Sequence, residues 1–188
     1  MDNAHAPQPF GRPRAAKQLV RKLLDNRWFR LGVVVGIIAL VTAGIAIQPS
    51  HINNPVPKNI RSSVPYTVYY PDPQKLPPGF SLVANSFRSP QAGVIVFTVA
   101  YGHGQNLVFS EQPMASSATL LEFINHYIPL HTTFNTPLGS AQLGAYNNNG
   151  ALRSVVNLPI IHGPWIIVTA PANINQFDLK QVIVALTS

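Results

Sequence analysis

The sequence contains no cysteine among its 188 residues. Disulfides and cysteine-ligated metal sites are therefore excluded, and any folded domain must be held together by its apolar core. Charged residues are also scarce, at 10% of the chain, and only six of them are acidic. With so few carboxylates, the paired acidic residues that many glycoside hydrolases use for catalysis are not expected.

Recognisable catalytic motifs are missing as well. No Gly-x-Ser-x-Gly element occurs, and Gly102-His103-Gly104 lacks the lysine and the following helix of a phosphate-binding loop. His126 and His131 are five residues apart on either side of Pro129, which is not the helical i, i+4 spacing of a zinc protease. A metal site that joins these or other histidines to Glu111 is an open alternative. We predict no catalytic residue, no metal, no cofactor and no enzymatic activity.

The formal net charge of +7 is unevenly distributed along the chain. Residues 1–30 carry seven Lys/Arg and two acids, a net +5, whereas residues 48–188 carry six Lys/Arg and four acids, a net +2. A basic protein invites a nucleic-acid interpretation. Because most of the surplus lies in the short first segment, we expect no nucleic-acid partner and assign this charge to membrane topology and anionic lipid.

One long apolar run, Leu31 to Ile47, divides the chain. As a helix it would cover roughly 25 Å, the short end of what crosses a bilayer. The basic residues directly before it predict a cytoplasmic N-terminus and a C-terminal domain outside the cell membrane, crossed once. A cleaved signal peptide is the alternative, since Gly44-Ile45-Ala46 fits a small-x-small cleavage site. The 30 residues that precede the run favour an uncleaved anchor.

The basic tail divides into two parts. Residues 1–13 are rich in Pro, Ala and Gln and are predicted to be disordered. Residues 14–30 alternate apolar and basic positions at helical spacing, which is typical of a helix lying on a membrane surface. The residues expected at the lipid interface are Arg21, Lys22, Arg27, Trp28 and Arg30.

The rest of the chain is predicted to be a linker and one domain. Residues 48–63 contain Pro49, Pro55 and Pro57, which disfavour helix and predict an extended linker. Residues 64–188 form a domain of ordinary size. Its apolar and β-branched runs predict strands at residues 64–70, 80–87, 93–101, 105–112, 131–136, 140–146, 151–157 and 165–170.

Two helices are expected among these strands. Thr119 and Glu122 have capping-box spacing, which predicts a helix that begins at Thr119 and stops before Pro129. Asn175 is a suitable N-cap for a second helix over residues 176–186, with Phe177 on its inner face. The sequence therefore predicts an α+β domain: a meandering antiparallel sheet, a mid-domain helix and a C-terminal helix, preceded by one transmembrane helix. Trp165, which opens an apolar strand, is assigned to the core.

Several short segments carry a family resemblance. They are Leu76-Pro77-Pro78-Gly79-Phe80, Gly139-Ser140-Ala141-Gln142-Leu143-Gly144, Trp165-Ile166-Ile167-Val168 and Asp178-Leu179-Lys180. With them, residues 64–188 resemble an uncharacterised bacterial ectodomain family found behind a single transmembrane helix, sometimes together with anti-sigma-factor segments. The resemblance implies a membrane-anchored extracytoplasmic domain. It does not imply sigma-factor binding here, because the tail is short and has no cysteine for a zinc-binding anti-sigma domain.

The remaining question is what the outer domain binds. Its possible ligand or partner surface consists of Tyr66, Tyr69, Tyr70, His103 and Glu111; Glu111 is the only acid of the domain without an evident local role. We expect a non-catalytic binding or sensory module for an unidentified extracytoplasmic ligand or protein partner. An accessory or structural component of an envelope or secretion assembly is the alternative. A pocket between sheet and helix would favour the first, and a flat apolar patch or an open sheet edge the second.

Overall fold

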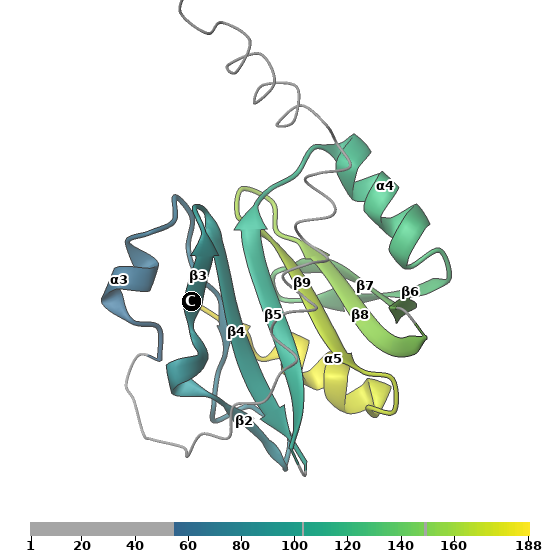
Figure 1. Cartoon of the computed structure of the whole chain (residues 1–188), viewed down its shortest axis with the longest axis horizontal. Coiled ribbons are helices and arrows are strands. Elements are labelled where there is room, and N and C mark those ends of the chain that lie inside the picture. Colours follow the sequence, from purple (N-terminus) through teal and green to yellow (C-terminus); the bar gives the residue numbers. More distant parts are fainter. Residues whose placement is uncertain (1–54, 103, 149) are drawn as a thin grey trace, which may run out of the picture. The chain divides into compact units, whose positions relative to one another are not determined.

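The computed structural model describes residues 55–102, 104–148 and 150–188 (Figure 1). The predicted tail, the apolar run at 31–47 and the interface residues Arg21, Lys22, Arg27, Trp28 and Arg30 lie outside these ranges. Among the described residues, no helix has the length and apolar character needed to cross a membrane.

An eight-stranded antiparallel sheet dominates the described part of the chain (Figure 1). Seven strands follow one another in the order β2, β4, β5, β9, β8, β7, β6, and β3 also pairs with β4. Their bounds along the chain are β2 Phe80–Leu82, β3 Arg88–Gln91, β4 Val94–Tyr101, β5 Gln105–Pro113, β6 His131–Thr136, β7 Gly139–Asn148, β8 Ala151–Pro159 and β9 Pro164–Pro171.

Shorter elements complete the described structure. The strands β1 (Tyr70–Pro71) and β10 (Leu186–Thr187) pair with each other in a separate two-stranded sheet. The helices are α3 (Lys58–Arg61), α4 (Ser117–Tyr127) and α5 (Gln176–Val184), and a single 3₁₀ turn covers Ala84–Ser86. The predicted α+β architecture with an antiparallel sheet, a mid-domain helix and a C-terminal helix is therefore confirmed for these residues.

The sheet is built from two runs of neighbouring strands. The β4–β5 hairpin comes first, and β6 to β9 form a second meander in which each strand pairs with the next. Helix α4 connects the two runs, and β9 then returns to pair with β5. Strand β9 is consequently central, which explains its almost complete burial.

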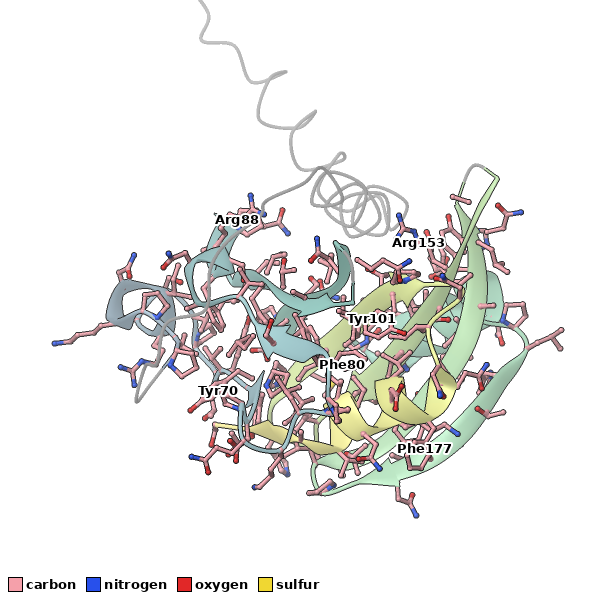
Figure 2. All side chains as sticks on the ribbon, turned by 90° about the horizontal axis from the view of Figure 1, so that it is seen from below. Tyr70, Phe80, Arg88, Tyr101, Arg153 and Phe177 are labelled. Atoms are coloured by element: carbon pink, nitrogen blue, oxygen red, sulfur yellow. The ribbon has the colours of Figure 1, made fainter. Side chains whose placement is uncertain are left out.

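Helix α5 covers one face of the sheet (Figure 2). Its side chains Leu179, Val182 and Ile183 are fully buried and share one apolar core with alternate residues of the central strands. Phe97 and Phe109 form the middle of that core, where their rings stack with centroids 4.7 Å apart. Asn175 caps the helix as predicted, because its Oδ1 accepts a hydrogen bond from the N–H of Phe177.

The opposite face carries Trp165, which the sequence assigned to the core and which is only 3% exposed. Phe123 of α4 meets the indole edge-on, with ring centroids 5.1 Å apart. The predicted N-cap of this helix is wrong: Ser116 caps it, and its Oγ accepts the N–H of Thr119. Both residues fit a Ser/Thr cap, and the N-cap lies three residues earlier than the capping-box pattern suggested.

Other expectations also differ from the structure. The strand predicted at 64–70 forms only at its end, in β1, because the residues before it bond to the sheet by other means. Residues 58–61, placed in an extended linker, form the single turn α3 after Pro57, a residue that suits a helix start. Phe177, predicted to face inward, is 66% exposed on the first turn of α5 (Figure 2).

Candidate functional site

A groove opens beside the N-terminus of α5, where the helix leaves part of the sheet uncovered. Its volume is about 550 Å³. The walls come from the end of the α4–β6 loop, from β6, β7 and β8, and from the start of α5. The lining residues are Pro129, Leu130, His131, Thr132, Leu143, Gly144, Ala145, Leu152, Ser154, Ala172 and Gln176. We call this site the α5 groove.

The chemistry of the α5 groove is mainly apolar. Leucines and alanines supply most of the wall, and no acidic or basic residue other than His131 belongs to it. Polar atoms come from Thr132, Ser154 and Gln176 as well. Apolar walls with a few polar groups suit a ligand that is held by burial and oriented by hydrogen bonds.

At one side of the groove, the loop between α4 and β6 lies close against the backbone of β7. A Cβ added to Gly144 would lie 2.7 Å from Cβ of Ile128 and 3.0 Å from the carbonyl oxygen of Leu130. Ile128 is fully buried, and its carbonyl oxygen lies 2.9 Å from Nδ1 of His131. A hydrogen on Nδ1 must therefore make this bond, since a carbonyl only accepts. Glycine at 144 thus allows the loop to turn tightly into β6.

Large apolar side chains stand exposed along the groove. Leu130 is 87% exposed and Leu152 is 56% exposed, and both line it. Phe177 follows the lining residue Gln176 and is exposed on the same side of the sheet as α5 (Figure 2). Single exposed leucines are ordinary, but two exposed leucines that line one concave site are typical of an interaction surface.

Strand β6 borders the groove and forms one edge of the large sheet. Within the described ranges it pairs with β7 only. Its sequence, His-Thr-Thr-Phe-Asn-Thr, contains none of the lysines or prolines with which proteins commonly protect a free edge. Phe134 is half-buried, with the Lys180 ammonium 5.5 Å from the centre of its ring. The edge is therefore open to pairing with another extended chain.

The structure brings together three of the residues proposed from the sequence as a ligand surface. Tyr66 donates its hydroxyl to the carbonyl oxygens of Gly93 and Glu111, each at 2.9 Å. The amide N–H of Tyr69 donates to the Glu111 carboxyl, 3.0 Å from Oε1 and 3.3 Å from Oε2. Here Glu111 gains the local role that the sequence left unexplained.

The other two residues of that proposed surface lie elsewhere or are not described. Tyr70 belongs to β1 and pairs with Thr187 of β10 (Figure 2). His103 lies outside the described residues. The Glu111 carboxyl is fully buried, so it does not reach the surface in this structure. A ligand role for the tyrosines stays a prediction.

Burial determines the electrostatics of Glu111. Removal from water raises the pKa of its carboxyl well above the ordinary value, and the hydrogen bond from Tyr69 offsets this rise only in part. Its partners across the ladder are Ile95 and Ile166, neither of which carries a charge. Burial also raises the pKa of the Tyr66 hydroxyl, and the nearby Glu111 charge adds to the rise. The pair therefore favours the uncharged forms.

A second buried polar cluster lies under α4. The Trp165 indole N–H donates to Oδ1 of Asn157, whose Nδ2 donates to Oε1 of Gln142 at 2.7 Å. Gln112 pairs with Trp165 across the ladder, and its Nε2 is buried without a hydrogen-bond partner among the described residues. This cluster orients the indole against Phe123.

Histidines and carboxylates are not gathered into a metal centre in the described part of the chain, where no group of three possible ligands occurs. His126 and His162 are exposed, whereas Glu111 is fully buried. Comparison with known proteins adds no further constraint: no family model, no curated protein and no solved structure matches the chain.

Sequence reasoning did not find the α5 groove. Its walls come from residues 129–132, 143–145, 152–154 and 172–176, which approach one another only once the strand order is known. The one signal available in the sequence was the position of Leu130 and Leu152 at strand ends, directly beside turn residues where apolar side chains are unexpected.

Proposed function

We propose that this chain is a single-pass membrane protein whose extracytoplasmic domain is a non-catalytic binding module, with the α5 groove as its ligand site. The observation that carries the proposal is the groove itself. Its volume of about 550 Å³ lies in the range of small-molecule and short-peptide sites, and its lining combines apolar walls with a few polar groups.

The anchoring part of the proposal rests on the sequence. Leu31–Ile47 is the one run long and apolar enough to cross a bilayer, and the excess of Lys/Arg before it sets the orientation. The predicted linker at residues 48–63 then places the domain outside the membrane. Lipid is accordingly a partner of residues 1–47, and the unidentified ligand is a partner of the domain.

The composition of the groove supports binding rather than hydrolysis. His131 and Ser154 both belong to its lining, but no carboxylate accompanies them. Nδ1 of His131 faces the carbonyl of Ile128, in the position where a triad carboxylate would orient a catalytic imidazole. We therefore assign the polar groups to ligand orientation.

A second candidate function is assembly with another protein, as an accessory component of an envelope or secretion complex. The open edge of β6, which contains no lysine or proline, supports it, because such an edge accepts a further strand from a partner chain. The exposed Leu130 and Leu152 beside that edge would be covered in the same event. Both functions use the same side of the domain but differ in the size of what binds there.

Photocrosslinking in intact bacterial cells distinguishes the two functions. A photoreactive amino acid is placed in the full-length chain at Leu152, inside the groove, and in a matched variant at Ile161, which is 81% exposed and does not line it. A binding module should give an adduct of small added mass at Leu152 only. A crosslink to a discrete protein would support assembly instead. Equal labelling at both positions, or none at Leu152, would contradict a site at the groove.

A further inference from the structure

Residues 66–69, which follow α3, are attached to the sheet by polar contacts rather than by a continuous ladder. Tyr66 and Tyr69 attach this segment to the ends of β4 and β5, where the acceptors are the Gly93 carbonyl, the Glu111 carbonyl and the Glu111 carboxyl. Val68, between the two tyrosines, is buried in the main core. This segment is the last stretch between the predicted membrane linker and the first strand.

Glu111 is an unusual acceptor for such an attachment. Its side chain is fully buried, and the described structure gives it the Tyr69 amide as a hydrogen-bond donor and no cationic partner. The groups that face it are Ile95 of β4, Ile166 of β9 and the two tyrosines of residues 66–69. Tyr66 and Tyr69 are the titratable groups among them, and neither supplies a positive charge.

We propose that residues 66–69 form a pH-dependent latch, closed over Glu111 while its carboxyl is neutral and released when the carboxyl loses its proton to water. A buried carboxylate without a cation is costly, so ionisation favours any state in which water reaches it. The state of this kind with the lowest free-energy cost is the one in which residues 66–69 detach. The alternative would separate β5 from β4 or β9, and both are paired with it by full ladders. The latch then connects the pH outside the membrane to the attachment of residues 66–69 to the sheet.

The direction in which latch closure depends on pH follows from the burial of the Glu111 carboxyl. Its pKa is raised in the closed state and returns toward the ordinary value of 4.5 when the segment lifts. The closed state therefore binds its proton more tightly, and closure is most stable at low pH. As the pH rises from about 4.5 toward the closed-state pKa, the opening equilibrium grows about tenfold per pH unit.

Hydrogen exchange on the full-length chain in detergent micelles tests the latch. The amide of Tyr69 is followed from pH 5 to pH 8, with the intrinsic exchange rate divided out. In the natural chain its protection should fall with pH by up to about tenfold per unit, while amides of β8 stay constant. In the E111Q variant, which keeps an acceptor oxygen but cannot ionise, protection should not change with pH.

Two further variants control the experiment. Asp72→Asn makes the same carboxylate-to-amide change at a half-exposed acid that pairs with Lys75, and it should keep the natural pH dependence. Tyr66→Phe removes the hydroxyl bonds but leaves Glu111 titratable, so protection should be lower at every pH with the slope preserved. This variant keeps the test decisive if E111Q does not fold.

Three results would overturn the latch. An E111Q profile identical to the natural one would remove Glu111 from the mechanism. Loss of protection in β8 together with Tyr69 would mean that the whole domain opens rather than residues 66–69 alone. A flat profile in both the natural chain and Tyr66→Phe would show that ionisation does not reach this site.

Discussion

Replacement of Trp165 by alanine is the most demanding test of the packing between α4 and the sheet. The side chain is 3% exposed, meets Phe123 edge-on, and donates its indole N–H to Asn157. Truncating a buried aromatic residue usually costs about 3–5 kcal/mol, because the cavity does not fully collapse. Here Oδ1 of Asn157 also loses its donor, so we expect the upper part of that range, about 4–5 kcal/mol.

Trp165→Phe separates the two contributions. The phenyl ring keeps most of the contact with Phe123 but cannot donate to Asn157, and an unpaired buried acceptor costs about 1–3 kcal/mol. Chemical denaturation of the full-length chain, followed by circular dichroism, measures both variants. Because the described domain has somewhat more than a hundred residues, a loss of 4–5 kcal/mol should lower Tm by roughly 15 °C or more.

Ile161→Ala serves as the control for both variants. Ile161 lies in the turn between β8 and β9, close in sequence to Trp165, but is 81% exposed. Its truncation should change the free energy of unfolding by less than about 0.5 kcal/mol. If Trp165→Ala proves no costlier than Ile161→Ala, the indole is not packed under α4, and the placement of β9 at the centre of the sheet is wrong.

Three other outcomes follow from the described contacts. Asn175→Ala should destabilise the domain by about 1 kcal/mol, because the N–H of the first helical turn loses its acceptor. Ser116→Ala should cost more than Thr119→Ala in a thermal melt, since Ser116 is the observed cap of α4; the reverse order would restore the helix start predicted from the sequence. Gly144→Ala should destabilise by about 1–3 kcal/mol through overpacking against Ile128, and unchanged denaturation would argue against the tight loop beside the groove.

Much of the sheet was predictable because its signals are local. Strand β4 is a continuous apolar run that is buried on both faces, and its predicted range matches the observed Val94–Tyr101 closely. The N-cap at Asn175 was likewise readable, since an amide before an apolar stripe is a short-range signal. The strand order could not be predicted, because β9 pairs with β5 although α4 and three strands separate them in the sequence.

The predictions that were wrong concern features that depend on tertiary contacts rather than on local sequence signals. Residues 64–70 have the composition of a strand, but Tyr66 and Tyr69 find acceptors on β4 and β5 through a hydroxyl and a single amide instead of a ladder. Phe177 was assigned to the inner face of α5, but at 3.6 residues per turn it lies on the side of the helix opposite Leu179 and Val182, which form the buried face. The α5 groove depends on four separate segments and therefore on the tertiary structure itself.

Topology mapping tests whether the chain is anchored in the membrane with its C-terminal domain outside the cell. The full-length chain is expressed in bacteria with one epitope tag at Met1 and another after Ser188, and protease is added to intact cells. An anchored extracytoplasmic binding module requires loss of the C-terminal tag and survival of the N-terminal tag in the membrane fraction, with both lost after lysis. Survival of the C-terminal tag in intact cells, or a mature protein without its N-terminal tag, would contradict the proposed anchor.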